Sequence, residues 1–410
     1  MIPIDPALAN MATPYLTQVQ TRPYCTCYMD KTDVSYLREV QQRRLNALPS
    51  RLRPFTARSR ELPRGLLLTG ARGVGKTTFL LHHAREKEML YISADNPRVA
   101  DVSLYDAGRT AFLSGYAGMI VDEVHFAREW SVHAKALYDD FPDRVLWLSD
   151  SSSLILRSAV ADVSRRFVSL TMPLLSFREF LALTQERQYP TFDAFGPIPL
   201  SADASLLRSF AEYRSYGTRP FFREGHYTER LQEVINKTIH YDIPFLLPSV
   251  TEGNLRLMNA VIGTLAHASI PRLHVRSLCA DWAIGSEKLY QLLFAMESVG
   301  LLTIVRQQND RKAKSVGEKL FFGDPTMYAV LGGEAGNARE ALVVSLLKQS
   351  GHTVETTRDD STGDFVVDGS TTIEVGGRSK KAKSADFVVR DDLDVPAGNA
   401  IPLWALGFGY

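Results

Sequence analysis

Short runs of apolar residues alternate with longer helical patterns between residues 61 and 185. The runs lie at 66–69, 89–93, 118–121, 145–149 and 167–170. Nearly continuous apolar runs of this length are typical of strands that are covered on both faces. Because helical patterns such as 78–87 separate the runs, this region is predicted to be a doubly wound α/β domain with a parallel sheet.

Four further units are predicted from the pattern. Residues 1–60 form an N-terminal extension with an amphipathic stretch at 33–48, and residues 186–268 are mainly helical. In 269–332, two helices are followed by a hairpin, which is the order of a winged helix. The expected helices are 275–284 and 287–299, and the expected strands are 301–306 and 319–322.

The last unit, residues 333–410, is predicted to be a small α/β domain. It begins with a helical pattern at 338–349. Strand-like runs follow at 353–356, 364–367, 371–375 and 387–389. A chain of 410 residues usually holds two or three domains, so its length fits an α/β core with smaller accessory units.

Composition narrows the class of protein. The chain is 45% hydrophobic and 23% charged, which is typical of a soluble globular protein. Its 47 basic and 46 acidic residues leave a net charge of +1, so any DNA contact must come from local patches. Three cysteines are too few for a zinc site or a disulfide framework. With neither a secretory signal nor an apolar run long enough for a bilayer, the protein is expected to be cytoplasmic.

The strongest motif follows the first apolar run. It reads Gly70, Ala71, Arg72, Gly73, Val74, Gly75, Lys76 and Thr77, with Thr78 next. Glycines let the backbone approach phosphates, and a helix N-terminus favours their charge. Lys76 is therefore predicted to reach the β- and γ-phosphates of ATP, and Thr77 to ligate Mg²⁺. The strand before the motif and the helix after it argue against a chance match.

A second motif ends the run at 118–121 with Asp122 and Glu123. A carboxylate at the tip of a buried strand is unfavourable unless it has a partner. Asp122 is predicted to hold Mg²⁺ through water, and Glu123 to be the base that polarises the attacking water. The alternative is an acidic pair on the surface. One further strand, 89–93, lies between the two motifs in the chain, and with Glu123 it favours an additional-strand ATPase over a kinase.

Two later positions are candidates for a role in hydrolysis. Ser149, at the end of its run, is a candidate sensor that touches the γ-phosphate and the attacking water; the alternative is an ordinary turn. Arg165 and Arg166 precede the last run and are candidate arginine fingers that act across a subunit boundary. Their alternative is a surface pair or a salt bridge within one subunit.

Together with several later segments, these motifs resemble a bacterial and archaeal branch of the AAA-type ATPases. The segments are 120–125, 149–156, 161–166, 175–180, 319–324 and 373–377. The Ser-Phe-Arg-Glu-Phe sequence at 176–180 is the most specific of them. The resemblance implies an AAA-like core, a helical lid over 186–268, a winged helix and a C-terminal domain of restriction-nuclease-like fold. It also suggests a link to DNA processing or mobile elements.

Basic residues gather at the tip of the predicted hairpin, namely Arg306, Arg311, Lys312 and Lys314. Each contact of such a residue with a phosphate would add salt-dependent affinity for DNA. The helix before the hairpin is not strongly basic, however, and winged helices also serve as protein-packing modules. Both DNA contact and a solvated hairpin therefore remain open at this stage.

In the restriction-nuclease-like fold, acidic residues bind Mg²⁺ and a lysine assists. Asp364 and Glu374 have a compatible spacing, and Glu340 lies on the preceding helix. Gly376 stands where that lysine is expected, so Lys380 or Lys381 would have to replace it. Two carboxylates can still hold a metal. The alternative is a domain that is kept for DNA binding or for structure.

The sequence thus predicts an oligomeric ATPase, in a ring such as a hexamer, that uses ATP and Mg²⁺ to act on DNA, including branched DNA. Lys76, Thr77, Asp122 and Glu123 would carry the hydrolysis. One alternative is a nucleotide-gated switch that binds a protein partner. Another is an ATP-regulated, metal-dependent nuclease.

Overall fold

The structure is a computed structural model, which describes residues 29–58, 61–152, 163, 165–185, 187–247, 249–268, 275–308, 319–358, 361–377 and 384–410. Several predictions fall outside these residues. They concern residues 1–28 and 59–60 of the N-terminal extension, part of the segments 149–156 and 161–166, the hairpin residues Arg311, Lys312 and Lys314, and the lysines Lys380 and Lys381.

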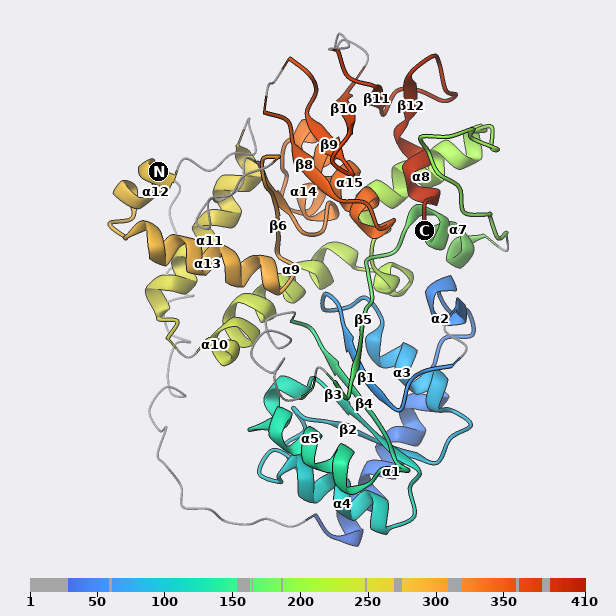
Figure 1. The fold of residues 1–410 in the computed structure, drawn as a ribbon, viewed down its shortest axis with the longest axis vertical. Coiled ribbons are helices and arrows are strands. Elements are labelled where there is room, and N and C mark those ends of the chain that lie inside the picture. The colour runs from blue at the N-terminus through green and yellow to red at the C-terminus, as the bar shows by residue number, and fades with distance from the viewer. Residues whose placement is uncertain are drawn as a thin grey trace.

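A parallel five-stranded sheet forms one lobe of the molecule, at the bottom of Figure 1. Its strands are β1 (Gly65–Thr69), β2 (Met89–Ser93), β3 (Gly118–Asp122), β4 (Val145–Asp150) and β5 (Val168–Thr171). The order in the sheet is β2-β3-β4-β1-β5, and every pair is parallel. The predicted parallel sheet is therefore confirmed. The strand that separates β1 from β3 is β4, which follows Asp122 in the chain, whereas β2 lies at the edge.

Helices cover both faces of this sheet. Successive strand residues point to opposite faces, and apolar side chains on both faces are buried by these helices. Leu66 and Leu68 belong to one apolar cluster with the helix α3 (Lys76–Ala84), whereas Leu67 belongs to another. The second cluster includes residues of α4 (Leu104–Leu113) and α5 (Trp130–Asp140). Before the sheet, α1 (Lys31–Asn46) and the short α2 (Pro54–Arg58) come from the predicted extension.

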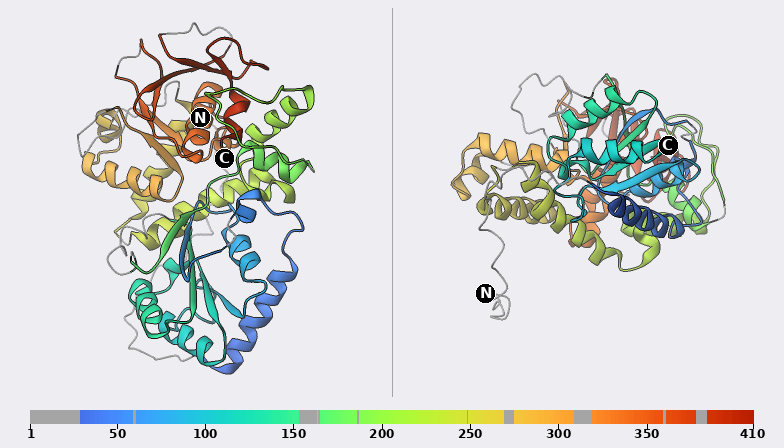
Figure 2. Two further views of the ribbon diagram at one scale, coloured as in Figure 1. Left: turned by 45° about the vertical axis from the view of Figure 1, so that its right-hand side comes forward. Right: turned by 90° about the horizontal axis from the view of Figure 1, so that it is seen from below.

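Residues 186–268 are predicted to be mainly helical, and the described part of this range is mainly helical from Ala204 onward. Its elements are α8 (Ala204–Tyr216), the 3-10 helix η3 (Pro220–Glu224), α9 (Tyr227–Lys237), the π-helical turn η4 (Thr238–Asp242), α10 (Ile243–Leu246) and α11 (Glu252–His267), and α7 (Phe177–Thr184) precedes them. We call residues 186–268 the lid. Figures 1 and 2 show α9 between the parallel sheet and the C-terminal lobe.

Two helices and a hairpin come next, in the predicted order. They are α12 (Val275–Asp281), α13 (Ser286–Ser298), and the antiparallel strands β6 (Leu302–Val305) and β7 (Lys319–Phe322). The hairpin does not stand alone, since Gln307 after β6 forms a parallel bridge with Thr356 of the next sheet. This contact joins the helix–turn–helix region to the C-terminal unit.

The C-terminal unit contains a mixed five-stranded sheet. The short α14 (Thr326–Val330) comes before it, and its own elements are α15 (Ala335–Gln349), β8 (Val354–Thr356), β9 (Phe365–Val367), β10 (Thr371–Gly376), β11 (Phe387–Arg390), β12 (Ala400–Pro402) and the 3-10 helix η5 (Leu403–Phe408). The order is β12-β11-β10-β9-β8, antiparallel from β8 to β10 and parallel from β10 to β12. One apolar core runs from Phe177 to Phe408, so the lid, the helix–turn–helix region and this sheet pack together.

Within the described residues, no helix combines the length and the apolar character needed to cross a lipid bilayer.

Candidate functional site

The loop between β1 and α3 curls around the side chain of Lys76. The Lys76 ammonium donates to the carbonyl oxygen of Gly70 at 2.8 Å and to Ser151 Oγ at 3.2 Å. Gly75, directly before α3, has a φ of 103°, a left-handed conformation that glycine adopts without the usual steric cost. The loop thus turns sharply into the helix, whose N-terminal N–H groups favour a bound anion.

Three hydroxyl groups hold the Asp122 carboxylate at the end of β3. Thr77 Oγ1 lies 2.5 Å from Asp122 Oδ2, and the Tyr91 hydroxyl donates to the same oxygen at 2.9 Å. Ser149 donates to Oδ1. Hydroxyl and carboxylate oxygens are the donors that Mg²⁺ prefers, so the chemistry of the Thr77–Asp122 pair fits this ion.

Glu123 lies beside Asp122, with its carboxylate turned toward the loop. Its backbone is left-handed, with a φ of 50°, which is uncommon for a residue other than glycine. Ser151 Oγ lies 3.0 and 3.1 Å from the two carboxylate oxygens, and the Arg72 guanidinium lies 3.4 Å from one of them. The sheet therefore brings Lys76, Thr77, Asp122 and Glu123 to one edge.

Burial disfavours the charged forms of both Glu123 and Lys76. It raises the pKa of Glu123, although the charges of Lys76 and Arg72 act in the other direction. It also lowers the pKa of Lys76, against the attraction of Glu123, Asp122 and Asp150. A nucleotide phosphate in the loop would add negative charge next to Lys76 and so favour its ammonium form.

Ser151, rather than Ser149, contacts the two groups expected to take part in hydrolysis. Ser149 is fully buried and donates to Asp122, whereas Ser151 bonds with both Lys76 and Glu123. The predicted sensor role of Ser149 remains a prediction. Ser151 was missed, although it stands in the same polar stretch at the end of β4.

His125 is a second residue that the sequence interpretation missed. Its Nδ1 lies 2.7 Å from Asp150 Oδ2 and 3.8 Å from Glu123 Oε2, and one potential metal-ligand atom from each of the three side chains lies within 4.8 Å of the others. Burial lowers the pKa of His125, but the hydrogen bond with Asp150 and the charges of Asp150, Glu123 and Asp242 together raise it above its usual value. The spacing Glu123-Val124-His125 was the available signal.

The raised pKa of His125 predicts a pH-dependent contribution to stability. Because the folded pKa exceeds the unfolded one, the contribution is complete below about pH 6.5 and is lost as the pH rises through the folded pKa. The melting temperature of His125→Gln should therefore fall further below that of wild type at about pH 5.5 than at about pH 8.5. The exposed His226, replaced in the same way, serves as the control. The prediction is contradicted if the difference in melting temperature between wild type and His125→Gln is the same at both pH values.

The lid reaches the loop through residues that carried no sequence signal. Arg219 pairs with the buried Asp324 at 2.6 Å and also donates to the backbone oxygen of Arg72. The ring of Phe221 lies so close to Gly73 that a Cβ there would be 2.8 Å from Phe221 Cε1. Lid side chains thus line one side of the phosphate-binding loop.

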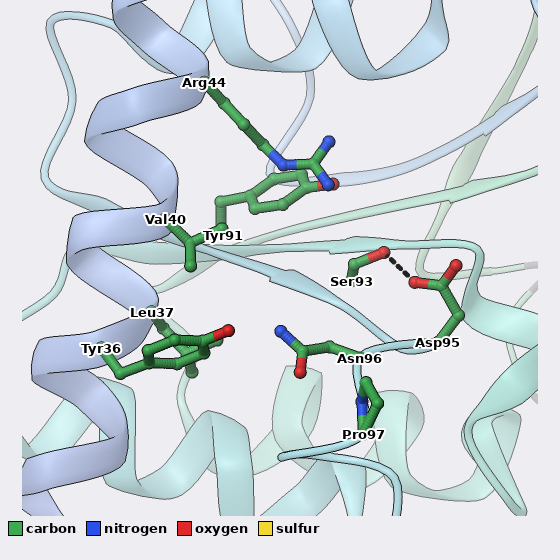
Figure 3. A pocket seen from close by; sticks show the side chains of 9 residues that line it. All are labelled: Tyr36, Leu37, Val40, Arg44, Tyr91, Ser93, Asp95, Asn96 and Pro97. Atoms are coloured by element: carbon green, nitrogen blue, oxygen red, sulfur yellow. Dashed lines mark hydrogen bonds between the residues drawn. The ribbon is translucent and has the colours of Figure 1, made fainter.

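A cavity of about 280 Å³ opens between α1 and the carboxyl end of β2. Figure 3 shows that, from α1, Tyr36 reaches toward Asn96 and Arg44 reaches toward Tyr91. The Arg44 guanidinium lies over the Tyr91 ring, at 5.1 Å from its centre. Because the Tyr91 hydroxyl bonds with Asp122, one wall of this cavity touches the proposed metal-binding carboxylate.

Arg165 and Arg166 lie just before β5, at the amino end of the sheet, whereas the loop lies at the carboxyl end. Arg166 forms two hydrogen bonds of 2.7 Å with Asp139 of α5. Arg165 is exposed. Within this chain neither arginine is brought to the loop, and the pairing of Arg166 matches the alternative of a salt bridge inside one subunit.

The carboxylates of the C-terminal unit meet a lysine that was not predicted. Lys319 of β7 lies 2.7 Å from Glu340 and 3.3 Å from Asp364. Asp364 also accepts from the backbone N–H of Val375, next to the fully buried Glu374. In the part of the chain that the structure describes, the only cluster of three metal-ligating groups is Glu123, His125 and Asp150.

Comparison with known proteins agrees with the geometry of the parallel sheet. Residues 63–181 match the family model described as an AAA domain. Residues 63–181 are thus similar to an AAA domain, and we call them the AAA-like domain. The AAA-like domain extends from the loop before β1 into α7 and contains the phosphate-binding loop, Asp122 and Glu123. The prediction of an AAA-type P-loop core is therefore confirmed.

The chain is also similar to a solved structure described as the Walker-type ATPase of Pyrococcus abyssi. The two are 15% identical, with 76% of this chain and 99% of that chain covered and a TM-score of 0.40. No curated protein matches the chain.

Proposed function

We propose that the AAA-like domain binds ATP together with Mg²⁺ and hydrolyses it. The observation that carries this proposal is the convergence of Lys76, Thr77, Asp122 and Glu123 at one edge of the sheet. Lys76 would contact the β- and γ-phosphates, and Thr77 and Asp122 would hold the ion. When bound, Mg²⁺ supplies positive charge to the phosphate oxygens.

Glu123 is the proposed general base. As a carboxylate it can accept the proton of a water molecule that attacks the γ-phosphate, and Ser151 and Arg72 hold its oxygens in place. Burial of the site keeps bulk water from screening these charges. Ser149 would act through Asp122, to which it donates.

We further propose that hydrolysis serves an action on DNA. Support comes from the helix–turn–helix of α12 and α13 and the hairpin that follows, since this order places a helix in a DNA groove in winged-helix proteins. Outward residues of α13, such as Glu287 and Gln291, are not basic. Contacts with phosphates would therefore come mainly from the hairpin, where Arg306 is half-exposed.

The rival is a nucleotide-gated switch that binds a protein partner. The bridge between Gln307 and Thr356 favours it, because a hairpin that packs on the C-terminal sheet is already a protein-packing element. A homo-oligomer, with Arg165 acting across a subunit boundary, remains part of the proposal in either case.

The steady-state rate of ATP hydrolysis tests these proposals, measured alone and with single-stranded, duplex and four-way-junction DNA. Lys76→Ala should reduce turnover to background, because it removes the cation that contacts the phosphates. Stimulation by one form of DNA would support the action on DNA and name the substrate. If none of the three DNA forms changes the rate measured without DNA, the protein-partner switch is favoured.

A metal-dependent nuclease remains the third possibility, with Asp364 and Glu374 as ligands. Lys319 places a positive charge on Asp364, which competes with a cation there. Cleavage of the DNA in the same reactions, dependent on Mg²⁺ and on Asp364, would establish this activity.

A further inference from the structure

Arg72 belongs to the phosphate-binding loop, and its side chain connects this loop to Glu123 and to Asp242 of the lid. Its side chain is 16% exposed and points to two carboxylates at once. Nε and one terminal nitrogen bond with Asp242 of the lid at 3.1 and 2.8 Å. The other terminal nitrogen lies 3.4 Å from Glu123. A planar guanidinium can serve two acceptors in this way because its N–H groups point in fixed directions.

The lid holds both the side chain and the main chain of Arg72. Asp242 is 2% exposed and lies at the end of the π-helical turn η4, a type of turn that is frequent at functional sites. Arg219, anchored by Asp324, donates to the backbone oxygen of Arg72. A movement of the lid relative to the sheet must therefore move Arg72 or break these contacts.

On the other side, Arg72 forms an ion pair with the proposed base. Among the described residues, the ion-pair partners of Glu123 are Arg72 at 3.4 Å and His125 at 3.8 Å. Glu123 follows directly after β3 in a left-handed backbone conformation. Its carboxylate is held by Ser151 Oγ at 3.0 and 3.1 Å and by the Arg72 guanidinium at 3.4 Å, and Arg72 is the member of this pair that also contacts Asp242.

We propose that Arg72 is a positioning residue for ATP hydrolysis, which links the orientation of Glu123 to the position of the lid through Asp242. This inference rests on the proposed ATPase function. The lid and the base change position together, because one planar guanidinium contacts both. Arg72 itself does not transfer a proton.

Substitution of Arg72 separates positioning from binding. In Arg72→Ala, kcat should fall about 10- to 100-fold, because a small displacement of a reacting group can cost that much. The Kd of a fluorescent ATP analogue should change by less than about threefold, since the effect is confined to the hydrolysis step. Arg72→Lys should remain impaired, because a lysine is a point charge that cannot hold two carboxylates in a fixed geometry.

The link to the lid is tested with Asp242→Asn and the double variant. Asp242→Asn should lower kcat as well, and Arg72→Ala combined with Asp242→Asn should be no slower than Arg72→Ala alone. Arg230→Ala is the matched control, since this lid arginine pairs with Glu224 at 2.9 Å on the surface. Its kcat should equal that of wild type.

Several outcomes would overturn the proposal. They are a wild-type kcat in Arg72→Ala, full rescue by Arg72→Lys, additive effects in the double variant, and lost ATP binding with kcat retained. If wild type is no faster than Lys76→Ala, the ATPase function itself fails. Hydrogen exchange then still tests the link, because Arg72→Ala, unlike Arg230→Ala, should speed exchange over 238–246. Unchanged exchange there would refute it.

Discussion

Replacing Glu123 by glutamine is expected to slow ATP hydrolysis by about 100- to 10,000-fold, the usual contribution of a general base. Glutamine has nearly the same shape and can still bond with Ser151, but it cannot accept a proton from water. ATP should therefore bind about as tightly as in wild type, because Lys76 and Thr77 are unchanged. The measurements are kcat at saturating ATP and the Kd of a fluorescent ATP analogue.

A matched control for Glu123→Gln is available in the same segment, between β3 and α5. Glu129 also has a left-handed backbone, with a φ of 48°, but its side chain is exposed. Glu129→Gln makes the same chemical change under the same backbone constraint and should leave hydrolysis unaltered. Full activity of Glu123→Gln would exclude Glu123 as the base, whereas equal losses in both variants would point to damage to the loop itself.

Removing the carboxylate of Glu179 is expected to lower the free energy of unfolding by about 3–5 kcal/mol, as for other broken buried ion pairs. Glu179 is fully buried and lies 2.5 Å from Arg53, which is 4% exposed. Arg53 also donates to the backbone oxygen of Val74 in the phosphate-binding loop at 3.0 Å and to the Tyr410 hydroxyl at 2.5 Å. In Glu179→Ala this guanidinium would stay buried without its counter-charge.

Urea denaturation of Glu179→Ala at pH 7 measures this effect. Burial raises the pKa of Glu179, but Arg53, Tyr410 and the backbone N–H of Phe55 together lower it by more, so the folded pKa lies below the unfolded one. The stabilisation is thus complete at neutral pH and is lost only as the pH falls through the folded pKa. Glu224→Ala, which breaks an exposed pair with Arg230, should cost at most about 1 kcal/mol. A cost for Glu179→Ala as small as that of Glu224→Ala would show that the buried pair adds little.

The same contacts give a physical reason for the Ser-Phe-Arg-Glu-Phe sequence at 176–180. Ser176 and Glu179 form a capping box that begins α7. Arg178 donates to the backbone oxygen of Tyr410 at 2.9 Å. This segment therefore begins a helix and also joins the end of the C-terminal unit to the region beneath the phosphate-binding loop.

The sequence by itself determined the features that depend on neighbouring residues. Burial of a strand on both faces selects a continuous apolar run, so the five strands of the parallel sheet could be located before their partners were known. The turn from β1 into α3 is formed by consecutive residues of one motif, from Gly70 to Thr77, so the motif alone predicts it. Asp122 could be assigned to the same edge because parallel strands end there together.

Only the tertiary structure decided which side chains meet across long stretches of chain. Arg53 and Glu179 are 126 residues apart, and Arg72 and Asp242 are 170 apart, so no local pattern pairs them. The choice of Ser151 over Ser149 as the contact of Lys76 depends on how the chain turns after β4. Lys319 reaches Asp364 because the hairpin packs against the C-terminal unit. Each of these contacts is set by the packing of separate elements, whose relative positions a local sequence pattern does not encode.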